Sequence, residues 1–472
     1  MKINAKTLGA AFLAAALFIV GCGRKQETNF QSLKDPTVSN QLKSFVAEKS
    51  AQANGVTNEM RPEFRKFFAA AQRGDWLTVS NMFRDWGRQN GNFEGSGNPD
   101  FGLRGTQWEA AKEIWGAFEG FFVGDKTYSA AYSKEIIDSI PAGSIYFGGT
   151  DPGRFLVTGM QKSHVNADPF FTLTQNALAD GSYLDYLRAM YGRRIYTPTE
   201  EDSRKSFQSY MEDAQKRLQN NQLRPGEDVK IADGRVQVSG QVAVMGINGL
   251  LAKIIFDRNG DREFYIEESF PLDWMFPHLE PHDLIMKINR QPRPELSDEV
   301  VKRDHDYWTK LVAPMIGNWL NEDTSVKTVA AFAERVFLRH DFGEFDGDRQ
   351  FVQNEYAQKM FSKVRSSTAG IYAWRLGLPP NGGKTPPQYL SKNELERQRM
   401  IKAADLAYRQ SWALCPYSPE AVYRYVAFLT NQKRFEDAIL VVDTALKFAL
   451  DPQTRPQFQD LSSRLHRYQN GK

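Results

Sequence analysis

Residues 144–154 read Ser-Ile-Tyr-Phe-Gly-Gly-Thr-Asp-Pro-Gly-Arg, and this stretch decides the expected fold of the central part of the chain. The apolar residues Ile145 to Phe147 predict a short buried strand, and the glycines after them predict a turn. Asp151 suits a helix N-cap, and Pro152 suits the first helical position because its missing N–H would have no partner there. A strand, a glycine turn and a helix in this order are typical of an α/β fold.

The same turn is a candidate ligand loop. Backbone N–H groups ahead of a helix can hold an anion, and Arg154 could add a bidentate contact to a phosphate or carboxylate. The residues of this candidate loop are Gly148, Gly149, Thr150, Asp151, Gly153 and Arg154. The turn lacks the Lys-Ser/Thr pair of a P-loop and the GxGxxG pattern, and Asp151 places a negative charge where a phosphate would sit. A purely structural connection between strand and helix is the alternative interpretation.

The segment around this loop, residues 131–295, alternates short β-rich runs with helical ones. Strands are expected at residues 144–147, 170–174, 264–266 and 284–288, and a hairpin around Asp233-Gly234. Thr199 and Asp202 predict the start of a long helix of mixed charge that ends near Asn220. This alternation predicts a layered, Rossmann-like α/β domain with some parallel strand pairing.

The segments before the α/β domain are expected to be a polar tether and a helical region. Residues 22–60 are polar with weak helical signals, and we interpret them as a tether. In residues 61–130, aromatic residues recur at helical spacing, as at Trp108, Trp115 and Phe118. Such a stripe could stack on sugars, but at this spacing it is more typical of a helix core.

The first 21 residues indicate export and lipid attachment. Lys2 and Lys6 form a basic head, Leu8 to Val20 is an uncharged apolar run, and Gly21 precedes Cys22. The run is too short to cross a bilayer as a helix, so it predicts a signal peptide. The segment resembles the lipobox of bacterial lipoproteins, which implies that the chain is cut before Cys22 and that this thiol is lipidated. An ordinary secretory signal with a chance cysteine is the alternative.

Composition limits the classes of function and the means of stabilisation. The 472 residues carry a formal net charge of +3, with basic and acidic residues interspersed, which does not indicate nucleic-acid binding. The length favours two or three domains. The sequence has 2 cysteines, and a lipidated Cys22 cannot pair with Cys415, so we expect no intramolecular disulfide.

Residues 296–472 have an almost entirely helical pattern, and their end resembles tetratricopeptide repeats. The spacing of apolar and small residues over about 355–452 matches helical hairpins with a repeat of about 34 residues. The signature residues are Ala404, Tyr408, Pro416, Tyr425, Leu429, Phe435, Ala438 and Ala445. Each such hairpin buries its apolar face against a neighbour, which predicts a stack of helices.

Other patterns that imitate ligand or catalytic sites have ordinary structural interpretations. His278 and His282 are four positions apart, but Pro281 interrupts the helix that would bring them to one face. Glu267 and Glu268 are neighbours on an expected strand, so their side chains point to opposite faces and cannot form an acid–base pair. We therefore assign no catalytic residue, metal ligand or cofactor.

Taken in order, residues 130–450 resemble the tail of a multi-spanning, glycosyltransferase-like family that includes protein O-mannosyltransferases. In that family an α/β region and tetratricopeptide repeats follow a membrane-embedded catalytic part. The matching segments are residues 145–151, residues 262–266 and the strand that ends before Pro292. The resemblance implies a stand-alone accessory tail without the family's membrane-embedded catalytic carboxylates.

Two functions are compatible with these patterns. The first is a lipid-anchored envelope protein that faces the periplasm and binds an envelope protein partner through its repeats, as a non-catalytic scaffold linked to envelope glycosylation or assembly. Gly23 replaces the aspartate that retains some lipoproteins at the inner membrane, which favours the outer membrane. The second is a protein that binds, or an enzyme that uses, a sugar phosphate or nucleotide sugar at residues 148–154.

Overall fold

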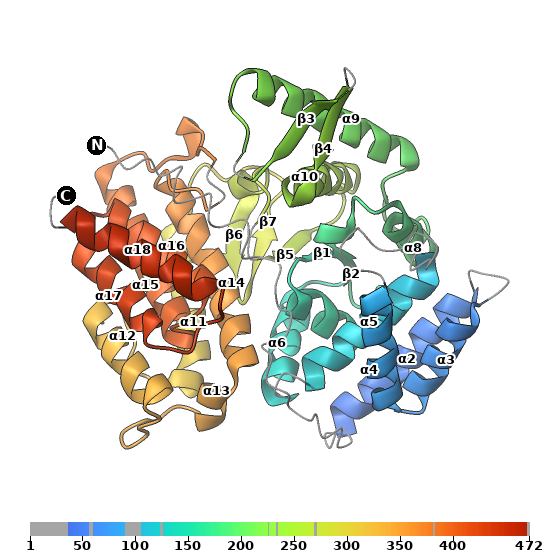
Figure 1. Ribbon diagram of the computed structural model, residues 1–472, viewed down its shortest axis with the longest axis horizontal. Coiled ribbons are helices and arrows are strands. Elements are labelled where there is room, and N and C mark those ends of the chain that lie inside the picture. Colours follow the sequence, from blue (N-terminus) through green and yellow to red (C-terminus); the bar gives the residue numbers. More distant parts are fainter. Residues whose placement is uncertain are drawn as a thin grey trace. The chain divides into compact units, whose positions relative to one another are not determined.

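The computed structural model describes residues 36–55, 60–89, 105–122, 126–224, 226–232, 235–268, 271–380 and 383–469. The predicted signal peptide, Cys22 and the Asp233-Gly234 turn lie outside the described residues. The chain divides into two compact units, which we call the N-terminal unit (described residues up to 267) and the C-terminal unit (described residues from 268). The fold is mixed and mostly helical, with N-terminal helices, a mixed five-stranded sheet and an all-helical C-terminal region (Figure 1). At this level the expected mixed architecture is confirmed.

The N-terminal unit begins with a group of helices. They are α2 (Pro36–Gly55), α3 (Pro62–Gln72), α4 (Trp76–Gln89), α5 (Gly105–Phe122) and α6 (Lys126–Ser139). The ring of Phe83 on α4 stacks on Trp108 and Trp115 of α5, with centroids 5.6 and 5.0 Å apart. The aromatic stripe is therefore used for helix packing, as its spacing predicts.

Helix α2 corrects the extent of the predicted tether. Its apolar residues Val38, Leu42, Phe45 and Val46 are buried, and it packs against α5 and α7 (Val157–Met160). These residues follow the i, i+3, i+4 pattern of an amphipathic helix, which the polar residues between them obscure in the sequence. Helix α2 therefore contributes its apolar face to the core of the N-terminal unit.

In the N-terminal unit the strand order is β2-β1-β5. In the N-terminal unit, β1 (Ile145–Gly148) pairs in parallel with β2 (Phe171–Thr174) on one side and β5 (Phe264–Glu267) on the other. The expected parallel pairing is thus confirmed. In the C-terminal unit, β6 (Leu279–His282) and β7 (Ile285–Ile288) form an antiparallel hairpin. The hairpin belongs to the C-terminal unit, since the two units divide between residues 267 and 268.

The residues between β1 and β5 include two longer helices and a separate hairpin. After β1 come a π-helical turn (Pro152–Leu156) and α7, and after β2 comes α8 (Gly181–Tyr191). Helix α9 (Glu200–Gln219) starts at a capping box in which Thr199 and Asp202 bond to each other's backbone N–H, as predicted. The hairpin of β3 (Asp228–Ala232) and β4 (Arg235–Ser239) follows.

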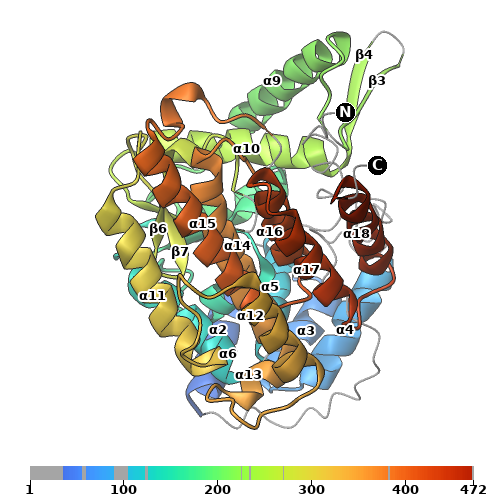
Figure 2. The ribbon, with the colours of Figure 1, turned by 90° about the vertical axis from the view of Figure 1, so that its left-hand side faces the viewer.

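Helix α10 (Gly240–Arg258) packs on α9 and on the β3–β4 hairpin. Together they enclose a small apolar core built around Tyr210, Ala214, Val229 and Ala243. Figure 2 shows α9 and this hairpin on one side of α10. Among the described helices, α10 is the one long and apolar enough to cross a membrane, a test that core helices also pass.

The C-terminal unit continues with helices only after β7. Its helices are α11 (Asp298–Ile316), α12 (Val326–Phe332), α13 (Arg349–Gln353), α14 (Glu355–Arg375), α15 (Glu394–Leu414), α16 (Pro419–Asn431), α17 (Phe435–Leu446) and α18 (Thr454–Gln469). From α14 to α18 each helix packs against the next one in the chain, and Figure 2 shows α14 to α17 side by side. The predicted stacking of successive helices is present here.

Candidate functional site

The candidate ligand loop lies at the carboxyl end of β1. Gly148 ends the strand, and the π-helical turn begins at Pro152. Asp151 occupies the predicted N-cap position directly before Pro152, but its backbone angles are helical and its side chain makes no capping hydrogen bond. Its carboxylate instead pairs with Arg154, with 3.2 Å between Oδ1 and Nη2. The loop thus neutralises its own arginine in part.

Glu267, at the carboxyl end of β5, fills this loop from inside. Its carboxylate accepts hydrogen bonds from the Thr150 backbone N–H at 3.1 Å, the Thr150 hydroxyl at 2.7 Å and the Tyr132 hydroxyl at 3.1 Å. The side chain is buried, and the backbone N–H of Gly149 donates to the Glu267 carbonyl at 2.7 Å. An incoming anion would have to displace a carboxylate of the same charge from these donors.

Gly153 is required by this close approach. A Cβ at position 153 would lie 1.6 Å from Oε2 of Glu267, so the Glu267 carboxylate would have to move away from its hydrogen-bond donors. The Tyr146 hydroxyl donates to the Gly153 carbonyl at 2.8 Å and fixes the turn from the other side. The glycine of the loop therefore serves the contact with Glu267.

The position of the loop in the sheet is the one where α/β proteins bind ligands. The chain passes from β1 to β2 on one side and later returns to β5 on the other side of β1. A crevice opens outside the carboxyl ends of the strands where the strand order reverses in this way. Gly148 and Glu267 end the two strands that flank this point.

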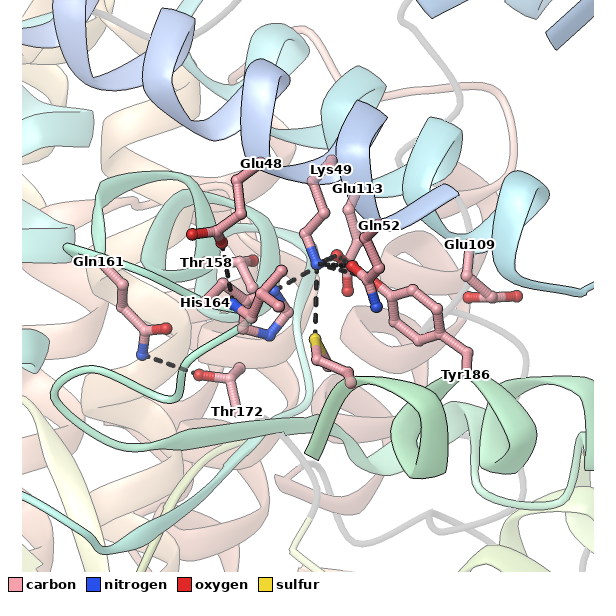
Figure 3. A network of polar contacts seen from close by, with 12 residues as sticks. Glu48, Lys49, Gln52, Glu109, Glu113, Thr158, Gln161, His164, Thr172 and Tyr186 are labelled. Atoms are coloured by element: carbon pink, nitrogen blue, oxygen red, sulfur yellow. Dashed lines mark hydrogen bonds and ion pairs between the residues drawn. The ribbon is translucent and has the colours of Figure 1, made fainter. Parts of the chain in front are cut away.

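A second cluster of polar residues is buried among α2, α5, α8 and the segment after α7 (Figure 3). Lys49 on α2 forms an ion pair with Glu113 on α5, with 2.7 Å between Nζ and Oε2. Lys49 also donates to the Tyr186 hydroxyl at 2.5 Å, and that hydroxyl donates to Glu113 at 2.5 Å. Nδ1 of His164 lies 3.4 Å from the same carboxylate oxygen. The Lys49 side chain is completely buried, so its charge depends on these protein groups for compensation.

The protonation states of this cluster follow from burial and pairing. Burial opposes the charge of Glu113, but the neighbouring Lys49 and His164 together outweigh it and hold the pKa of the carboxyl far below its usual range. Burial lowers the pKa of Lys49, and Glu113 opposes that shift. Burial also lowers the pKa of His164, and neither ring nitrogen has a hydrogen-bond partner among the described residues. We therefore assign a charged Lys49–Glu113 pair beside a neutral histidine.

Neighbouring contacts extend the cluster to the loop after α7. The Glu48 carboxylate accepts the backbone N–H of Val165 at 2.8 Å and the hydroxyl of Ser163. The side-chain amide of Gln161 donates to the Thr172 hydroxyl at 2.9 Å. Because Glu48 and Lys49 of α2 bond to residues of other elements, the cluster joins α2 to the rest of the N-terminal unit.

Sequence patterns offer little indication of this cluster, because each member stands alone within a helical pattern. The one local signal is a charged residue within the apolar face of a helix. Lys49 lies three positions after Val46, on the helix face that carries Leu42 and Phe45. A lysine there needs a buried partner, but nothing local identifies Glu113.

The C-terminal unit contains a comparable buried ion pair. Arg365 on α14 bonds both oxygens of Asp304 on α11 through Nη1, at 3.0 and 2.8 Å. Its Nε donates to Gln410 at 2.8 Å, and the Tyr372 hydroxyl donates to Asp304 at 2.7 Å. Both charged side chains are fully buried. The guanidinium also lies 4.9 Å from the ring centroid of Trp308.

The repeat-signature residues are distributed over successive packed helices. Ala404, Tyr408, Tyr425, Leu429, Ala438 and Ala445 are buried on α15, α16 and α17. Pro416 lies between α15 and α16, and its carbonyl accepts the indole N–H of Trp412 at 3.1 Å. Phe435 begins α17 and packs on Tyr468 of α18, with ring centroids 4.6 Å apart. These residues therefore occupy helix-packing positions.

No group of three or more His, Cys, Asp or Glu side chains in the described part of the chain is arranged to hold a metal ion. His278 directly precedes strand β6, and His282 is the last residue of that strand. Nδ1 of His278 lies 2.7 Å from the Asn289 carbonyl oxygen. No protein-family model, curated protein or solved structure matches this sequence.

Proposed function

We propose that this chain is a lipid-anchored envelope protein that acts as a non-catalytic scaffold and binds a protein partner through its C-terminal helices. The observation that carries the proposal is the packing of α14 to α18, each against the next. Ala404, Ala438 and Ala445 are fully buried, which allows close approach of neighbouring helices. Stacks of this kind expose extended surfaces that suit polypeptide ligands.

The finer description of the fold belongs to the same proposal. We interpret α15 to α17 as tetratricopeptide-like repeats and the β2-β1-β5 region with its helices as a Rossmann-like layer. Together they fit the accessory tail of the O-mannosyltransferase-like family and favour a role beside an envelope glycosylation or assembly complex. The lipid at Cys22 would hold the protein at the outer membrane, facing the periplasm.

The scaffold proposal is tested with the full chain in its native membrane. A photo-reactive amino acid replaces Lys433 or Glu436, which are exposed around the start of α17, and in the control it replaces the exposed Lys205 of α9. We expect one stoichiometric cross-linked partner from the two positions near α17 and none from position 205. Failure to capture a stoichiometric partner from either position near α17 contradicts the proposal.

The anchor is tested separately. Labelling with a palmitate analogue is expected to mark the wild-type chain and not the Cys22→Ser variant, and the variant should leave the membrane fraction. An unlabelled wild-type chain contradicts lipid attachment without affecting the test of the partner.

A second candidate is binding of a sugar phosphate or nucleotide sugar at residues 148–154. It is favoured by the position of the loop, where the strand order reverses. Nucleotide sugars and polyprenyl phosphates are expected to raise the melting temperature of the wild-type chain and not of Arg154→Gln, with Lys205→Gln as the matched control. Equal shifts in all three proteins, or no shift in any, contradict this candidate.

A further inference from the structure

We propose that a hollow beside α11 in the C-terminal unit binds a zwitterionic ligand of dipeptide size, with its ammonium group at Glu322 and its carboxylate at Lys310. The hollow has a volume of about 510 Å³, within the range of small-ligand sites. Its wall is the face of α11 that carries His305, Thr309 and Lys310, and the apolar side chains Ala313 and Leu406 also line it. The inference depends neither on a lipid anchor nor on a protein partner.

The opposite wall is a loop that α15 holds in place. Arg409 of α15 donates to the carbonyl oxygens of Asn321 at 3.4 Å, of Glu322 at 2.9 Å and of Thr324. Its charge is balanced by Asp405, 3.0 Å away. Because three carbonyls of the loop bond one buried guanidinium, the backbone at Glu322 is held in place before a ligand arrives. A preformed wall reduces the ordering cost of binding.

The hollow contains one uncompensated charge of each sign. Asp306 also lines it but pairs with Lys302. The titratable group closest to the Glu322 carboxylate is the imidazole of His305, whose Nδ1 lies 3.5 Å away. Burial, followed by the nearby Arg365, lowers the pKa of His305 despite Asp304 and Glu322, so the imidazole is neutral near pH 7. Lys310 is exposed and has no ion pair or hydrogen bond among the described residues.

The arrangement along α11 sets the size of the ligand. Glu322 lies beside His305, and Lys310 follows five positions later, about 7.5 Å further along the helix axis and about 140° around it, where it also lines the hollow. A fully extended dipeptide spans about 7 Å between its ends. An ammonium at Glu322 would therefore place the carboxylate of a dipeptide near Lys310. The side chains of Thr309 and Asn318, which also line the hollow, offer hydrogen bonds to the peptide group between them.

The test is isothermal titration calorimetry, in which the full chain is titrated with dialanine and the dissociation constant is measured. We expect dialanine to bind and both N-acetyl-dialanine and dialanine amide to bind about five- to tenfold more weakly, because each lacks one charge. Single alanine is expected to be weaker because it cannot reach both charges.

Variants then assign each charge to its residue. Lys310→Gln is expected to lower the affinity for dialanine about five- to tenfold and to leave the affinity for dialanine amide unchanged. Glu322→Gln should lower the affinity for dialanine by the same factor and leave the affinity for N-acetyl-dialanine unchanged. The matched controls are Lys327→Gln and Glu299→Gln, exposed residues of α12 and α11 outside the hollow, and circular dichroism checks that every variant is folded.

Four results overturn the inference. One is the absence of dialanine binding up to about 10 mM. Another is equal binding of the free and blocked dipeptides. The third is binding that neither Lys310→Gln nor Glu322→Gln weakens. Binding of tetra-alanine but not of dialanine also overturns it, since the hollow would then serve a longer polypeptide.

Discussion

The two compact units each bury a complete ion pair, but they do so with different cations. In the N-terminal unit, the Lys49 ammonium touches Glu113, Tyr186 and Gln52 at 2.7, 2.5 and 3.3 Å. In the C-terminal unit, the Arg365 guanidinium bonds both oxygens of Asp304 and the side chain of Gln410. A tyrosine hydroxyl donates to the carboxylate in both cases.

The difference concerns geometry and titration. A guanidinium is a planar fork that stays charged and fixes the direction of each hydrogen bond, whereas an ammonium is a compact charge whose pKa shifts readily on burial. The arginine pair is therefore expected to specify one arrangement of α11 and α14. The lysine pair, beside a neutral buried histidine, is expected to respond to pH.

Removal of the carboxylate from the lysine pair should have the largest effect. Glu113→Gln leaves Lys49 buried without a counter-charge, and we expect a loss of about 3–5 kcal/mol in the free energy of unfolding of the N-terminal unit. Hydrogen exchange of peptides from α2, α5 and α8 along a urea series measures it. Glu63→Gln, in a partly exposed pair with Arg61, should cost less than about 1 kcal/mol. Equal costs for the two variants would show that the buried pair has no special role.

Replacement of arginine by lysine distinguishes geometry from charge in the second pair. Arg365→Lys keeps the charge but cannot bond Gln410 and both oxygens of Asp304 at once, so we expect a loss of about 2–3 kcal/mol. Exchange of peptides from α11 and α14 reports it. The matched control, Arg303→Lys, changes a half-exposed arginine of α11. A neutral Arg365→Lys variant would mean that charge alone is required.

Glu267 extends the comparison to a carboxylate held by backbone and hydroxyl donors. Gly153→Ala would force the new methyl group against that carboxylate, at an expected cost of about 1–3 kcal/mol. Thermal denaturation measures this loss of stability, and hydrogen exchange of peptides from β1 and β5 shows whether it arises at these strands. The control is Gly181→Ala, where a Cβ meets nothing within 4 Å. If the two alanine variants are equally stable, the loop does not depend on its contact with Glu267.

The smallest effect is a pH dependence of the N-terminal unit. His164 has a lowered pKa in the folded chain, so below about pH 6.5 the unfolded chain binds a proton that the folded chain excludes. Stability should therefore fall as the pH drops, by at most about 1.4 kcal/mol for each pH unit. Urea unfolding between pH 7 and pH 5 measures the slope, which His164→Gln should reduce. An unchanged slope would assign the acid sensitivity to other groups.

Local signals in the sequence predicted the local elements well. The apolar run before Gly148 became β1, and the Thr199–Asp202 capping box begins α9. Ala438 and Ala445, which the helical spacing singled out as packing positions, are both fully buried on α17.

What the sequence could not predict depends on contacts between distant residues. Glu267 occupies the loop from 117 positions away in the chain, and nothing near residue 150 indicates that its donors are already used. The burial of α2 was missed because its apolar stripe is interrupted by lysines and glutamates, one of which finds its partner only after folding. The hollow at α11 likewise combines a helix face with a later loop and with Leu406.

The small core under α9 and the β3–β4 hairpin has a consequence for how the chain opens. It is separate from the core around the sheet, and the apolar side chain of Ile231 near the end of β3 is more than half exposed. A region with so few enclosed side chains has little free energy resisting its release. Brief exposure to a protease should therefore nick the chain first between Arg224 and Ser239, while the parallel strands on either side of β1 stay protected.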